Sequence, residues 1–208
     1  MTTRSSLIAG CMLVGSLAAS AATKDSRTQL RLDMRKLWDD HASYTRSYVI
    51  SALAGLPDTD AVAQRLLKNQ DDIGAAVAKF YGASAGQQLT TLLKSHISIA
   101  VDLIKAAKAG DKTAQKAADD KWQQNAVDIA DFLSKANPNW PRATLVDMMN
   151  KHLATTTDEV VARLTKNWAA DVRAFDAVYD HILMMSDALS DGIIKQFPAK
   201  FSGSTTRQ

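Results

Sequence analysis

The chain has 208 residues, of which 46% are hydrophobic and 23% are charged, and its formal net charge is +3. This is the composition of a globular protein with a sizeable core, and it excludes collagen, low-complexity chains, polytopic membrane proteins and disulfide-rich miniproteins. Basic and acidic residues are interspersed without a basic block, so we expect no nucleic-acid partner.

Residues 1–21 have the pattern of a cleaved signal peptide. Arg4 precedes an apolar run over residues 7–19, and Ala19-Ser20-Ala21 fits the small-x-small rule for a cleavage site. A lipoprotein signal ending at Cys11 is the alternative, although the apolar run continues well past that residue. Cleavage after residue 21 predicts a periplasmic or secreted protein that has no thiol and no membrane attachment.

The remaining sequence has helical periodicity throughout. Apolar side chains recur every three or four residues, and breakers such as Gly110-Asp111 and Asn137-Pro138 separate the periodic stretches. The last turn is expected near Asn167, although Thr156-x-x-Glu159 resembles a capping box that could begin a helix earlier. We predict one helical domain over residues 22–200, followed by a disordered tail over residues 201–208. The expected helices span residues 25–54, 59–80, 85–108, 112–136, 142–164 and 168–196.

An internal repeat of about 56 residues organises these helices. An ungapped shift by 56 aligns Asn69 with Asn125 and His96 with His152, and the next step from Asn125 reaches His181. His41 precedes His96 by 55 residues. The fold class expected from this spacing is an all-α bundle of six helices, built from three antiparallel hairpins.

The repeat places all four histidines at one level of the bundle. Each lies on the apolar stripe of its helix, and matching distances from the turns give them equal heights. One interpretation is a structural polar layer, in which every imidazole is hydrogen-bonded and tightly packed. The other is a site for a metal ion or a small ligand, which requires an accessible pocket beside the imidazoles.

The third hairpin favours a metal, with copper first and then zinc or iron. It carries His181 and Met184 where the second hairpin has Asn125 and Asp128, and imidazole with thioether suits copper. Methionine is also an ordinary filler of hydrophobic cores, which supports the structural interpretation. The candidate metal ligands are His41, His96, His152, His181, Met148, Met149, Met184 and Met185. The candidate acceptors for the second ring nitrogens are Asn69, Asn125, Asp72 and Asp128.

Enzyme motifs do not occur in the sequence. The single glutamate, Glu159, and the lack of Glu-x-x-His disfavour a ferritin-type di-iron site. His-Glu-x-x-His, the phosphate-binding glycine loop and Gly-x-Ser-x-Gly are missing as well. A c-type haem would need Cys-x-x-Cys-His, and bis-histidine b-type haem is a less favoured alternative. We therefore expect either a metal-binding protein or a non-catalytic scaffold that binds a partner the sequence does not identify.

Several short patterns are spread over residues 30–198. They are Trp38-x2-His41-x3-Thr45-Arg46, Arg65-Leu66-Leu67-x-Asn69-Gln70-x-Asp72-Ile73-Gly74, Leu92-Leu93-x2-His96-Ile97, Asn125-x3-Ile129-Ala130-x-Phe132-Leu133, Asn137-Pro138-x-Trp140-Pro141 and Gly192-Ile193-Ile194-x-Gln196-Phe197-Pro198. In these patterns the chain resembles an uncharacterised family of secreted, all-helical bacterial proteins, some of which carry an automatic glycosyltransferase label. No nucleotide-sugar site supports that label here, so the resemblance implies the helical fold and secretion but no activity.

Overall fold

The computed structural model describes residues 26–201, which form six α-helices and a short 3-10 helix and contain no strand. The predicted all-helical fold with six helices is confirmed, and the helix ends differ from the expected ones by at most two residues. The expected signal peptide and the tail from residue 202 lie outside the described residues. The helices are α1 (Ser26–Ala54), α2 (Thr59–Tyr81), α3 (Ala83–Ala109), α4 (Lys112–Ala136), α5 (Arg142–Leu164) and α6 (Trp168–Gln196), followed by the 3-10 helix Pro198–Lys200.

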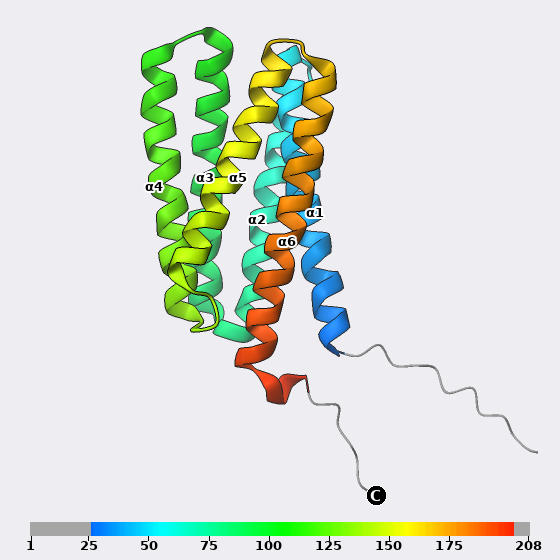
Figure 1. Ribbon diagram of the computed structural model, residues 1–208, viewed down its shortest axis with the longest axis vertical. Helices are drawn as coiled ribbons and strands as arrows, with labels where there is room; N and C mark the ends of the chain where they lie inside the picture. The colour runs from blue at the N-terminus through cyan, green and yellow to red at the C-terminus, as the bar shows by residue number, and fades with distance from the viewer. Residues whose placement is uncertain (1–25, 202–208) are drawn as a thin grey trace, which may run out of the picture.

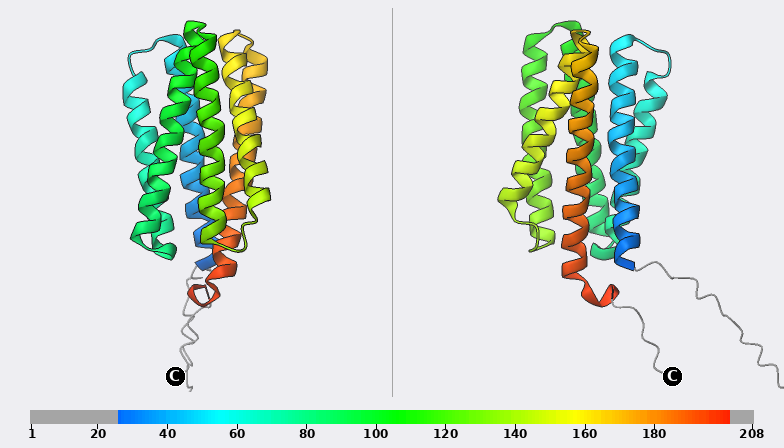
Figure 2. Two further views of the ribbon diagram at one scale, coloured as in Figure 1. Left: turned by 90° about the vertical axis from the view of Figure 1, so that its left-hand side faces the viewer. Right: turned by 45° about the vertical axis from the view of Figure 1, so that its right-hand side comes forward.

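The six helices form a closed ring of antiparallel neighbours (Figure 1). Each helix packs against the next one in the chain, and α6 returns to pack against α1. The turns that follow α1, α3 and α5 gather at one end of the bundle, which is the upper end in Figures 1 and 2. We call this the turn end.

Each turn at this end is shaped by a residue with positive φ. Gly55 and Gly110 adopt φ values of 70° and 71°, which glycine reaches without a steric penalty. Lys166 takes this role in the third turn with φ 58°, and the Asn167 side chain then caps α6 by accepting from the Ala170 amide at 3.2 Å. The prediction of a turn near Asn167 is therefore confirmed, and the earlier helix start at Thr156 is wrong because α5 runs through it.

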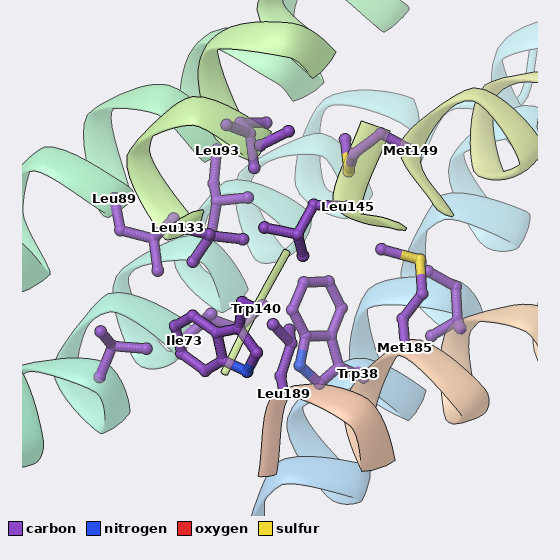
Figure 3. Close-up of a cluster of buried hydrophobic side chains, with 14 of the residues drawn as sticks. Trp38, Ile73, Leu89, Leu93, Leu133, Trp140, Leu145, Met149, Met185 and Leu189 are labelled. Carbon is purple, nitrogen blue, oxygen red and sulfur yellow. The ribbon is translucent and has the colours of Figure 1, made fainter. Parts of the chain in front are cut away.

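A large hydrophobic cluster fills the bundle away from the turn end. It includes Trp38, Leu145 and Leu189, which lie close together in Figure 3. Phe201 also belongs to this cluster, and its ring stacks on Phe80 with a centroid separation of 5.9 Å. The expected domain boundary at residue 200 is therefore one residue short, because Phe201 is buried rather than part of a tail.

Two glycines allow α2 and α3 to approach closely. A Cβ atom added to Gly86 would lie 2.6 Å from the Gly74 carbonyl oxygen and 2.7 Å from the Ala78 Cβ. A Cβ added to Gly74 would lie 2.8 Å from the Gly86 carbonyl oxygen. Because backbone atoms oppose each other here, a side chain could be accommodated only by moving the helices apart.

We therefore predict that Gly86→Ala lowers the free energy of unfolding by about 1–3 kcal/mol, the usual effect of an overpacked core. Urea unfolding followed by circular dichroism measures the change. Ser84→Ala, at an exposed position of the same helix, is the control and should leave the stability unchanged. Equal stability of Gly86→Ala and the parent protein would contradict the close approach.

Candidate functional site

Three of the four histidines meet in the middle of the bundle. His41 on α1, His96 on α3 and His152 on α5 are buried, and the His152 ring lies 5.8 Å, centroid to centroid, from both other rings. We call these three side chains the histidine layer. His181 does not join it: it is half-buried, and its Nε2 donates to the Met148 carbonyl oxygen at 2.8 Å.

The second helix of every hairpin makes an equivalent contact with the first. In each case a polar side chain donates to a backbone carbonyl, and this carbonyl belongs to the residue four positions before a layer histidine. These contacts follow the 56-residue spacing of the sequence and hold each hairpin in register. The donor and acceptor pairs are Asn69 Nδ2 to Leu37 O (2.9 Å), Asn125 Nδ2 to Leu92 O (3.2 Å) and His181 Nε2 to Met148 O (2.8 Å).

His96 uses both ring nitrogens within the protein. Its Nδ1–H donates to Asn125 Oδ1 at 2.8 Å, and its Nε2 accepts from the Trp122 indole N–H at 3.1 Å. Burial lowers the pKa of His96 to about 4, while the bond to Asn125 acts in the opposite direction. This imidazole is therefore neutral, fixed in one tautomer and without a free lone pair for a metal ion.

His41 and His152 are less completely bonded. His41 Nδ1 accepts a long hydrogen bond of 3.4 Å from Gln70, which also donates to Asn69 Oδ1. His152 Nδ1 has no hydrogen-bond partner within residues 26–201. Asn125, whose side-chain amide bonds His96 in the second hairpin, is replaced by His181 at the equivalent position of the third. Burial lowers the pKa of His41 to about 3 and that of His152 well below its usual value, so both rings are neutral.

The predicted methionine ligands differ in their burial. Met149 and Met185 belong to the hydrophobic cluster shown in Figure 3, Met148 is half-buried, and Met184 is 46% exposed. Among residues 26–201 no three or more His, Cys, Asp or Glu side chains are arranged to hold a metal ion. Met148, Met149 and Met185 nevertheless line a small cavity beside the three layer histidines, so of the predicted thioether donors only Met184 lies away from them.

Of the predicted acceptors, only the asparagines lie at the layer. Asn125 bonds His96 directly, and Asn69 reaches His41 through Gln70. Asp72 instead pairs with Lys68, and Asp128 is exposed and accepts from Gln124 at 2.9 Å. These two aspartates therefore belong to the solvated faces of α2 and α4.

A cleft of about 660 Å³ lies between the histidine layer and the turn end. Its floor consists of the three layer histidines with Thr45, Trp122 and Thr156, and Lys112 and Lys116 lie near its mouth. Below the layer, the same imidazoles bound a second cavity of only about 40 Å³ within the hydrophobic cluster. The layer therefore separates the packed core from the accessible cleft. The apolar walls include Ile97, Ala100, Leu103, Ile104, Val160 and Leu164.

Two threonines at the floor were not predicted from the sequence. Thr45 and Thr156 follow His41 and His152 by four residues, which places each on the same helical face as its histidine. Neither hydroxyl has a hydrogen-bond partner within the described part of the chain. Together with His152 Nδ1, these hydroxyls give the floor three buried polar atoms with unused hydrogen-bonding capacity.

Arg46, Glu159, Arg163 and Asp171 form an ion-pair network close to Thr45 and Thr156 in sequence. Arg46, beside Thr45, donates to Glu159 at 2.9 Å and to Asp171, and Arg163 donates to Asp171 at 2.9 Å. Burial raises the pKa of Glu159, although Arg46 opposes the effect. Burial would also raise the pKa of Asp171, but hydrogen bonds from the two arginines lower it. This network ties α1, α5 and α6 together and leaves neither arginine free for an anion.

Comparisons with known proteins give no match to a family model, a curated protein or a solved structure. Within the part of the chain that the structure describes, no helix combines the length and the apolar character needed to cross a bilayer. The function must therefore be inferred from the layer and the cleft themselves.

The equivalence of the three hairpin contacts predicts different outcomes for two substitutions of His181. In His181→Asn the amide can donate to Met148 O and accept from His152 Nδ1, as Asn125 does at His96. The free energy of unfolding should change by less than about 0.5 kcal/mol or increase. His181→Leu leaves the carbonyl and His152 without this partner and should cost about 1–3 kcal/mol. Urea unfolding distinguishes the variants, and equal destabilisation by both would contradict the equivalence.

The lowered imidazole pKa values predict that stability falls with acidification. The unfolded chain binds protons near pH 6.5 whereas buried His96 does so only near pH 4, so stability declines as the pH falls between these values. The loss should be roughly 2 kcal/mol by pH 5 for His96 and a similar amount for His41. Urea unfolding over this range measures it. His41→Gln should make the decline shallower, and an unchanged slope in that variant would refute the assignment.

Proposed function

We propose that this protein binds a small, largely apolar organic molecule in the cleft above the histidine layer. The observation that carries the proposal is the combination of an accessible cavity of about 660 Å³ with apolar walls and a polar floor. Cavities of this size that place a few polar groups among hydrophobic side chains are typical of ligand sites.

The floor is unlike a purely structural polar layer. A structural layer would bond every imidazole to a neighbour, as His96 is bonded, and would leave no space beside the rings. Instead, His152 Nδ1 and the hydroxyls of Thr45 and Thr156 have no partner among the described residues, and all three residues line the cleft. A bound molecule with a polar group can satisfy these atoms, which favours ligand binding over a scaffold role.

A transition metal is the weaker proposal for the same residues. Neutral imidazoles are suitable ligands, and copper, zinc and iron all accept them. However, His96 has no free ring nitrogen, His181 bonds a backbone carbonyl, and Met184 faces solvent. Elemental analysis of the purified protein tests this alternative, since a stoichiometric metal would support it.

The ligand proposal is tested with N-phenyl-1-naphthylamine, an uncharged probe whose fluorescence increases in apolar sites. We expect saturable binding with one probe per chain. Ala100→Trp fills the cleft wall and should weaken binding by at least roughly tenfold, because the indole occupies the space of the probe. Fluorescence titration measures both affinities, with circular dichroism as the check on folding.

The matched control is Ala75→Trp, which places the same side chain at an exposed position of α2, outside the cleft lining. It should bind the probe like the parent protein. Absence of saturable binding by the parent, or equal binding by folded Ala100→Trp, would overturn the proposed function.

A further inference from the structure

We infer that the ligand is an uncharged amphiphile, of the class of long-chain alcohols and amides, bound with its polar head on the histidine floor and its chain toward the turn end. This inference rests on the proposed function and specifies its ligand. It is carried by the hydrogen-bonding groups of the floor, the commitment of the nearby charges and the shape of the cleft.

The floor offers unused hydrogen bonds of both kinds. The buried hydroxyl of Thr156 and that of Thr45 can each donate and accept, and the unpartnered His152 Nδ1 can do one or the other. A hydroxyl or amide head likewise donates and accepts, so one such group can satisfy several of these atoms together. An alkane end would leave these atoms unpaired, as they are in the ligand-free protein, whereas a polar head would offset a penalty that the fold already carries.

A charged head would find no counter-ion at this depth. The layer imidazoles are neutral because burial disfavours their protonation. Arg46 and Arg163 are engaged by Glu159 and Asp171. An anion on the floor would therefore lose its hydration without gaining an ion pair. Asp119, which also lines the cleft, lies one helical turn from Trp122 toward the mouth and interacts electrostatically with Lys116. It would draw an ammonium group away from the floor, so the floor itself favours an uncharged head.

The upper part of the cleft is suited to an extended chain. His96 and Ala107 both line it, and their separation of eleven positions on α3 corresponds to a rise of about 16 Å. The side chains along this path are predominantly aliphatic, and Lys112 and Lys116 lie near the mouth. A single alkyl chain can therefore lie along the wall while the head stays at the layer.

Three probes of one chain length test the inference. 1-Dodecanol, dodecanoate and dodecylammonium are titrated at neutral pH against bound N-phenyl-1-naphthylamine, the alcohol below its solubility limit and the two ions below their critical micelle concentrations. We expect the alcohol to displace the fluorescent probe with an affinity roughly tenfold or more above that of either ion. Because the three probes have the same alkyl chain, the difference between their affinities is due to the head group.

Substitution of the floor locates the head. Thr156→Val keeps the shape of the side chain and removes the hydroxyl, and it should weaken 1-dodecanol binding roughly fivefold. The melting temperature of the ligand-free variant should be equal or higher, because an unpaired buried hydroxyl has been removed. A purely structural threonine would show the reverse, with lower stability and unchanged affinity. Thr113→Val, at an exposed position of α4 outside the cleft lining, is the control and should bind like the parent.

The outcomes separate this inference from the proposal on which it depends. Saturable binding of N-phenyl-1-naphthylamine with equal or better displacement by dodecanoate overturns the inference and leaves the binding function standing. Loss of dodecanoate binding in Lys112→Ala would then place a carboxylate at the mouth. If the parent protein does not bind N-phenyl-1-naphthylamine, the proposed function and the inference fall together.

Discussion

The burial of three imidazoles at the centre of the bundle is the constraint on which the other features of the molecule depend. Each ring must stay neutral, because within residues 26–201 no carboxylate is hydrogen-bonded to it that could balance a positive charge. The protein meets this condition with amides: Asn125 bonds His96, while Asn69 and Gln70 serve His41. The same asparagines donate to the facing helix, so one set of polar contacts sets both the hairpin register and the imidazole tautomers.

Much of the fold could be predicted because its determinants are local. The period of the apolar residues and breakers such as Gly110 give the six helices, and Asn167 marks the last turn through its capping side chain. The start of α3 was misplaced by two residues because Gly82 alone makes the connection, and the small residues up to Gly86 continue the helix. There the close contact with α2 outweighs the low helix propensity of glycine.

The candidate site was only partly predictable, because a pocket depends on how helices diverge and not on periodicity. The spacing of the histidines indicated a shared level, and three of them do meet. The same spacing could not show that the Met184 side chain is exposed. A separation of three residues places Met184 near His181 on the helix surface, but it does not determine whether that face is buried. Thr45 and Thr156 do have a sequence signal, because each follows a layer histidine by four residues, but a hydroxyl is not a typical ligand of a transition metal.

The third hairpin differs from the other two where the cleft reaches the layer. Replacing asparagine with His181 preserves the bond to the backbone carbonyl but leaves His152 Nδ1 without the amide that the second hairpin provides. An unpaired buried nitrogen destabilises a fold, and a core shaped for stability alone would have filled this position with the asparagine already used twice. His152 lines the cleft beside Thr45 and Thr156, whose buried hydroxyls are also without a partner among the described residues. A ligand that supplies the missing hydrogen bonds would stabilise the folded protein, and this linkage is the physical basis of the proposal that the floor binds a ligand.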